Sequence, residues 1–397
     1  MTELIWLGFG LSLALLLIIA RRSVWVALIV SSLTLGIFGL PFNRILWEIY
    51  KTLTNPSILL LALGIGLIPM IGGAMEEGGL MNALVQNLRI GKRLFSGIAP
   101  ALLGMLPIPG GALLSAPLLK MVGKGISEIK KSAINVWFRH ILLLIYPLGA
   151  LLVTTKMAGL NLYGVIPYLF PGLILMFILG YLFLLKDVKG GMSYSSDFRL
   201  RGLLIPIMVI LIAPSIHFLL ITLFPEFSPE IFLVIGISTS LILAFYLGKL
   251  SWRDLKSIWL KMEPWKFSLI IIGMFLFLNM FKASDVSKVI ADIAFSRSFL
   301  IVGIGAFFGF VTGRVQIPVS ILLPIYYSKY GENTMTPLIF SIMFFSIFMG
   351  YVISPVHPCV SVSLEFFKVS LKNFFKTLII PTIIALAIAF IFATILL

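Results

Sequence analysis

The stretch G-M-L-P-I-P-G-G-A-L-L, residues 104–114, places Pro107, Pro109, Gly110 and Gly111 inside a run that is otherwise apolar enough to cross a membrane. In lipid, every backbone polar group must be satisfied by the protein, so non-helical backbone is tolerated only where protein or a water-filled cavity surrounds it. Proline removes a hydrogen-bond donor and glycine permits a sharp turn. We therefore expect this segment to be the tip of a re-entrant hairpin that lines a hydrated cavity.

The composition is that of an integral membrane protein. Of 397 residues, 60% are hydrophobic and 11% are charged, and the mean hydropathy is +1.12. A soluble chain of this length could not bury so much apolar surface. The net charge of +15 is spread over short loops, which argues against a nucleic-acid partner. The one cysteine, Cys359, excludes an internal disulfide.

Ten apolar runs approach the ~20 residues that cross a bilayer. They cover residues 3–20, 22–40, 56–75, 133–156, 160–185, 202–224, 228–248, 267–282, 337–363 and 372–397. Two further apolar stretches, at about 94–120 and 299–326, are broken internally by proline and glycine. If both enter and leave on the same side as hairpins, most of the 30 basic residues lie in cytoplasmic loops, as the positive-inside rule requires. This topology puts both termini outside.

The hairpins make the chain a predicted inverted repeat. Each half has five crossings and one hairpin, and an odd number of crossings inserts the second half upside down. We predict an all-α polytopic membrane protein with a first repeat at 1–190, a cytoplasmic linker at 191–201 and a second repeat at 202–397. The string G-x-x-x-I-P occurs in both hairpins, in G-M-L-P-I-P and in G-R-V-Q-I-P, residues 313–318.

The crossing after each hairpin is also broken, at Pro147 and Gly149 in the first half and at Pro355 and Pro358 in the second. Hairpin tips and broken helices at corresponding positions indicate a substrate site. The candidate residues are Pro107, Pro109, Gly110, Gly111, Arg314, Gln316, Pro318 and Ser320 at the tips, and Thr154, Ser354 and His357 in the broken helices. For any one Ser or Thr, a hydrogen bond to its own helix is the alternative.

Charged groups within the bilayer are expensive and indicate function. Arg314 at the second tip could hold a carboxylate in a bidentate pair, or could serve a structural role. Arg139 could belong to the site or extend to the interface. His140 and His357 could carry protons, or could be neutral and buried.

Three acidic residues end helices at matching places in the two halves. Glu76 and Glu77 follow the third span, and Asp285 follows its counterpart in the second half. They could couple transport to Na⁺ or H⁺, or could terminate helices at the interface. The sequence does not specify a metal or another cofactor.

This architecture resembles that of the ion transporter superfamily, which includes gluconate and lactate permeases, citrate and dicarboxylate symporters and some sodium/proton antiporters. The strings G-M-L-P-I-P-G-G-A-L-L-S-A-P-L and S-P-V-H-P-C-V-S-V are most similar to a family of predicted ten-helix membrane proteins without an assigned substrate. The resemblance implies a homodimer with a scaffold and a moving transport domain. The Ser-Asn-Thr signature of dicarboxylate symporters is missing at both tips, which counts against dicarboxylate/Na⁺ symport.

We therefore expect a multi-pass transporter of the cell's plasma or inner membrane that moves a small organic anion of the carboxylate class by alternating access, coupled to H⁺ or Na⁺. The alternatives are a cation/proton antiporter and a membrane protein of the same fold without transport activity. An enzyme is not expected, because the chain has no H-E-x-x-H, G-x-S-x-G or Walker motif.

Overall fold

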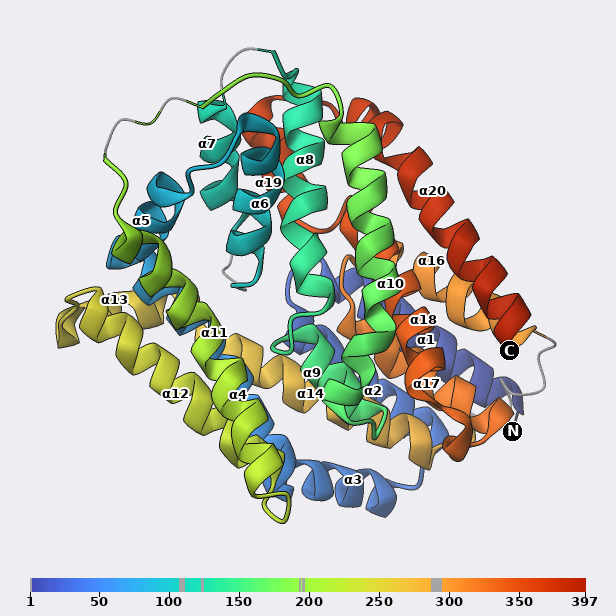
Figure 1. The fold of residues 1–397 in the computed structure, drawn as a ribbon. Coiled ribbons are helices and arrows are strands. Elements are labelled where there is room, and N and C mark those ends of the chain that lie inside the picture. Colours follow the sequence, from blue (N-terminus) through green and yellow to red (C-terminus); the bar gives the residue numbers. More distant parts are fainter. Residues whose placement is uncertain (1, 107–110, 123–124, 193, 195–196, 287–294) are drawn as a thin grey trace.

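The computed structural model describes residues 2–106, 111–122, 125–192, 194, 197–286 and 295–397, and these residues form helices without a strand (Figure 1). The first half contains α1 (Thr2–Ala20), α2 (Val24–Gly39), α3 (Phe42–Thr54), α4 (Pro56–Glu77), α5 (Leu80–Asn87), α6 (Lys92–Gly104), α7 (Ala112–Met121), α8 (Glu128–Ile141), η1 (Leu142–Leu144), α9 (Ala150–Met157), α10 (Leu162–Gly180) and η2 (Tyr181–Leu185). The second half contains α11 (Leu200–Leu223), α12 (Pro229–Leu247), α13 (Trp252–Met262), α14 (Pro264–Ala283), η3 (Phe299–Ile304), α16 (Gly305–Thr312), α17 (Gln316–Tyr330), η4 (Glu332–Thr334), α18 (Pro337–Ile353), α19 (Pro358–Phe367) and α20 (Leu371–Leu396).

The fold is the all-α membrane fold that the sequence predicts. In the described part of the chain, eight helical segments are long and apolar enough to cross a membrane: Glu3–Ala20, Pro56–Glu77, Leu162–Leu185, Leu200–Leu223, Pro229–Leu247, Pro264–Ala283, Pro337–Phe367 and Leu371–Leu396. Neither of the other two expected crossings is a single long helix. The helix in the expected span 22–40 has 16 residues, and the span 133–156 is divided between α8 and α9.

Apart from α5, which lies between the long helix and the expected hairpin of the first half, the described elements follow the same order in each half. Two helices come first, followed by a short helix and a long helix, then a pair of helices at the expected hairpin, a broken helix and a final long helix. In the second half, Gly313–Val315 separate the two hairpin helices and Ser354–His357 separate α18 from α19. The described chain is therefore interrupted at both predicted breaks and between the two helices of the second predicted hairpin.

The helices pack in two bundles that cut across the predicted halves. The first bundle contains α1–α5 and α11–α14, and the second contains α6–α10 and α16–α20. Figure 1 shows α4, α11 and α12 at the lower left, with α7, α8, α10 and α20 above them and to the right. Each bundle thus combines corresponding helices from both halves, and both hairpins and both broken helices belong to the second bundle.

Glycines bring the hairpin helices of the second bundle close to the broken helices. A Cβ atom on Gly104 of α6 would lie 1.8 Å from the carbonyl oxygen of Arg139 on α8. A Cβ on Gly309 of α16 would lie 2.1 Å from the carbonyl oxygen of Ile347, and one on Gly350 of α18 would lie 2.0 Å from that of Ala306. Small residues at such crossings let helices in membranes approach closely.

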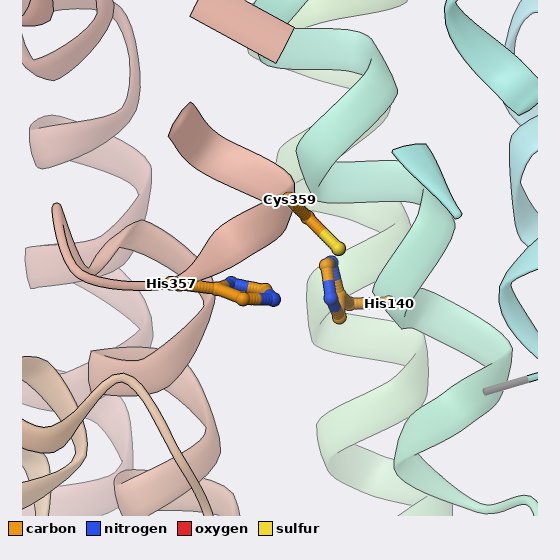
Figure 2. A group of neighbouring side chains, drawn as sticks. All are labelled: His140, His357 and Cys359. Atoms are coloured by element: carbon orange, nitrogen blue, oxygen red, sulfur yellow. The ribbon is translucent and has the colours of Figure 1, made fainter. Parts of the chain in front are cut away.

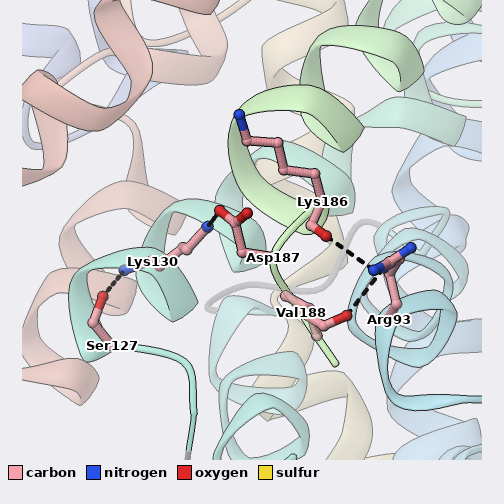
Figure 3. A network of polar contacts seen from close by, with 6 residues as sticks. All are labelled: Arg93, Ser127, Lys130, Lys186, Asp187 and Val188. Carbon is pink, nitrogen blue, oxygen red and sulfur yellow. Dashed lines mark hydrogen bonds and ion pairs between the residues drawn. The ribbon is translucent and has the colours of Figure 1, made fainter. Parts of the chain in front are cut away.

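At one end of the second bundle, a polar network joins three segments of the first half (Figure 3). Arg93, near the start of α6, donates hydrogen bonds to the carbonyl oxygens of Lys186 and Val188, at 2.9 and 3.0 Å. Lys130 on α8 pairs with Asp187 at 3.0 Å, and this hydrogen bond lowers the pKa of the Asp187 carboxyl. The network fixes the ends of α6, α8 and α10 relative to one another.

Candidate functional site

The tip of the second hairpin packs directly on the break between α18 and α19. Gly313 has a φ of +59°, and a Cβ at this position would lie 2.9 Å from the backbone nitrogen of His357. Glycine is therefore required both for the turn and for the close approach. Ser354 extends the contact, because its hydroxyl donates a hydrogen bond to the carbonyl oxygen of Phe310. Arg314 follows the turn and is thereby held beside the break.

Asn135 and Arg139, one turn apart on α8, reach the first hairpin and α19. The Asn135 amide donates to the carbonyl oxygen of Ala112 at 3.2 Å and to the hydroxyl of Ser363 at 2.9 Å. The Arg139 guanidinium donates longer hydrogen bonds, to the Ser115 hydroxyl at 3.4 Å and to the carbonyl oxygen of Leu106 at 3.5 Å. Helix α8 is thus the element on which the first hairpin and the second broken helix meet.

Near the two arginines lies a compact group of side chains formed by His140, Tyr351, His357 and Cys359, called here the central cluster. The rings of His140 and His357 are 4.8 Å apart, and those of Tyr351 and His357 are 4.1 Å apart. Figure 2 shows His140 on α8 facing His357 and Cys359 on the neighbouring chain segment. His140 is 1% exposed and His357 is 2% exposed, whereas Tyr351 and Cys359 are half-buried, so the two imidazole rings are closed to solvent in this conformation.

Hydrogen bonds fix the tautomer of His140. Its Nδ1 lies 2.6 Å from the carbonyl oxygen of Val136, which can only accept, so Nδ1 carries the proton. Nε2 is then an acceptor, and the Tyr351 hydroxyl donates to it at 3.3 Å. Two buried polar atoms beside this network, Nδ1 of His357 and Oδ1 of Asn135, have no hydrogen-bond partner in the described part of the protein. Such atoms are costly when buried, and they are where a ligand would bind.

The charge around the cluster is positive. Arg139 is 4% exposed and Arg314 is partly buried, and both guanidinium groups act electrostatically on Tyr351, His357 and Cys359. Neither arginine forms an ion pair with a carboxylate that the structure describes. The arrangement is suited to an anion, because guanidinium groups bind carboxylate and other oxyanions with paired hydrogen bonds.

His140, His357 and Cys359 are also the residues that could hold a metal ion. Their ligand atoms lie within 4.8 Å of one another, and the fixed tautomer of His140 is one that metal-binding histidines use. Zinc bonds of about 2.0–2.3 Å would, however, draw these atoms closer together than that. The two neighbouring arginines oppose a cation, so the geometry favours an anion over a metal.

The comparisons with known proteins place the chain in a family and match its fold. The family model described as "Protein of unknown function (DUF401)" matches residues 7–396. The chain belongs to the DUF401 family. No curated protein matches it. Its fold is similar to that of the Alcanivorax borkumensis YdaH transporter, with a TM-score of 0.61 and 13% sequence identity over 89% of this chain and 87% of the transporter chain.

The structure brings several of the predicted site residues together and leaves others apart. Arg314, Ser354 and His357 meet Arg139 and His140 around the central cluster. Gly111 precedes Ala112, which accepts the hydrogen bond from Asn135, and Gln316 and Pro318 lie in the first turn of α17. Pro107, Pro109 and Gly110 lie outside the described residues.

Five predicted residues are not part of this arrangement. Thr154 donates to the carbonyl oxygens of Ala150 and Leu151, and Ser320 donates to that of Ile317, so both hydroxyls bond to their own helices. Glu76 pairs with Lys261 at 2.9 Å. Glu77 is exposed at the end of α4, and Asp285 follows α14; these three acidic residues belong to the first bundle.

Sequence reasoning missed Asn135, Tyr351 and Cys359. Asn135 precedes Arg139 by four residues, which places both on the same face of α8, and this spacing could have indicated the amide. Tyr351 and Cys359 flank the second break, but an aromatic residue or a cysteine in an apolar helix gives no sign of a site by itself. Their role depends on contacts with residues about two hundred positions away.

Proposed function

We propose that this DUF401 protein is a secondary active transporter that moves a small organic anion of the carboxylate class across the cell membrane by alternating access, with coupling to H⁺ or Na⁺. The observation that carries the proposal is a pair of arginines, Arg139, which is buried, and Arg314, which is half-buried, beside one cluster and without a described carboxylate partner. In lipid, such groups are retained where they bind a ligand or an ion.

In the proposed mechanism, Arg314 holds a carboxylate of the cargo through two parallel hydrogen bonds. Arg139 approaches the cargo from α8. The unpaired Nδ1 of His357 and Oδ1 of Asn135 provide further polar contacts. His140 and His357 are closed to solvent in this conformation, so the cargo enters and leaves when the two bundles move relative to each other. His140 and His357 are the candidates for proton coupling, because imidazole titrates near neutral pH.

We further propose that the second half is inverted relative to the first, that the chain is related to the ion transporter superfamily, and that both termini lie outside. The matching order of helices in the two halves supports the repeat. The division into two bundles supports a scaffold, the first bundle, and a moving domain, the second. The homodimer stays a prediction from the resemblance.

A thermal-shift screen of the purified protein tests the proposed function. A ligand that binds only the folded state raises the melting temperature. We expect stabilisation by one or more carboxylates or sugar acids, lost in Arg314→Ala and retained in Arg253→Ala, which removes an exposed arginine from α13. Stabilisation by Na⁺ or by pH alone, without a response to any anion, would contradict an anion transporter.

A further inference from the structure

From the charges around the central cluster we infer that the cargo carries two negative charges, one neutralised by Arg139 and the other by Arg314. This inference rests on the proposed function and specifies its substrate class. The inference is based on the number of positively and negatively charged residues in the second bundle, because the whole candidate site lies in that bundle.

The two arginines come from different helices and from different halves of the chain. Arg139 lies on α8, against Leu106 and Ser115 of the first hairpin. Arg314 lies at the tip of the second hairpin, beside the break that follows α18. Both act electrostatically on Cys359 and His357, so an anion beside these two residues would feel both charges.

The helices around the site offer no internal counter-charge. Residues 92–127, 129–186, 293–331 and 333–364 contain no aspartate or glutamate. Three of the acidic residues that flank these segments are paired with lysines or exposed. Glu128, at the start of α8, pairs with Lys131 at 2.8 Å, Asp187 pairs with Lys130, and Glu365 is exposed near the end of α19.

Removing an unpaired charge from water costs several kcal/mol. A cargo with one negative charge would compensate one guanidinium group and leave the other without a counter-charge. A cargo with two negative charges compensates both, whether they belong to two carboxylates or to one divalent oxyanion. Two guanidinium groups without a described carboxylate, one buried and one half-buried, therefore favour a dianion over a monoanion.

The preference for a dianion can be measured by comparing the affinities of the protein for matched dianions and monoanions. We would determine the affinity of the purified protein at pH 7.5 for succinate and sulfate, as dianions, and for butyrate and methanesulfonate, as monoanions of related shape. Because a charge-assisted hydrogen bond contributes about 1.5–3 kcal/mol, we expect the better dianion to bind about tenfold or more tightly than its monoanion. A preference for succinate alone would identify two carboxylates, and a preference for sulfate alone would identify a single oxyanion.

Three variants test whether the preference for a dianion depends on Arg139 and Arg314. Arg139→Gln and Arg314→Gln are each expected to lose most of the preference for the dianion, whereas Arg139→Lys keeps the charge and should retain it even if Arg139→Gln does not fold. Equal binding of mono- and dianions, dependent on Arg314 but not on Arg139, would overturn this inference and leave the proposed function intact. A dianion preference unchanged in both glutamine variants would also overturn it. If none of the four anions binds, the result counts against both the dianion inference and the proposed function. Binding of Zn²⁺ that requires Cys359 and His357 would count against both as well.

Discussion

Asn135 connects three helices through one amide. It donates from α8 to the carbonyl oxygen of Ala112 on α7 and to the hydroxyl of Ser363 on α19. Asn135→Ala leaves both groups without this donor, so we expect it to lower the free energy of unfolding by about 1 kcal/mol. The melting temperature of the purified variant measures the loss.

Ser132→Ala is the matched control for this change. Ser132 is buried on the same helix, but its hydroxyl donates only to the carbonyl oxygen of Ile129, within α8. We expect a change of a few tenths of a kcal/mol at most. Equal destabilisation by the two substitutions would show that Asn135 does not connect the helices.

At the residue scale, the sequence predicted the site in part. Arg314 could be found because it follows Gly313 at a helix break, and a charge at such a place is exceptional in an apolar chain. Thr154 was less predictable, since a hydroxyl in a membrane helix serves its own backbone as readily as a ligand. Tyr351 could not be found, because its partner His140 comes from a helix about two hundred residues away.

Among the elements, the pair α16 and α18 has a close contact that can be tested from both helices. Gly309 and Gly350 face the backbone of the opposite helix at distances that leave no room for a Cβ. We expect Gly309→Ala or Gly350→Ala to separate the helices and to destabilise the fold by about 1–3 kcal/mol, the usual cost of overpacking. Gly10→Ala on α1, where nothing lies within 4 Å, should leave the melting temperature nearly unchanged.

The first hairpin makes a prediction about topology. If α6 and α7 enter and leave on the same side, Gly91 and Met121, at their outer ends, face the same compartment. In a Cys359→Ser background, Gly91→Cys and Met121→Cys should both react with a membrane-impermeant maleimide only from the cytoplasmic side. Reaction of the two cysteines from opposite sides would show that the segment crosses the membrane and would end the inverted-repeat proposal.

The order of these elements could be predicted from the sequence, whereas their packing could not. Apolar length and positive loops predicted crossings and hairpins because both are local properties of the chain. The two bundles arise from contacts between distant helices, such as α4 with α12 and α8 with α19. An apolar sequence carries little information about which helix lies beside which.

For the whole molecule, the proposed mechanism requires the two bundles to move. Lys156 at the end of α9 pairs with Glu230 at the start of α12 at 2.6 Å, and this ion pair joins the second bundle to the first. We expect a short bismaleimide that links Lys156→Cys to Glu230→Cys to abolish transport. A link between Lys130→Cys and Asp187→Cys, an ion pair at 3.0 Å within the second bundle, should leave transport largely intact. Full transport with both links would exclude relative movement of the bundles as the mechanism.

The most direct test of the account is uptake into proteoliposomes of the radiolabelled anion that gives the largest thermal stabilisation, with the unlabelled anion inside. We predict that the wild-type protein and Arg253→Ala accumulate the label, while Arg314→Ala does not exceed protein-free liposomes. Uptake by Arg314→Ala equal to that of the wild type would show that the central cluster is not the transport site, and no uptake by the wild type would contradict the proposed function itself.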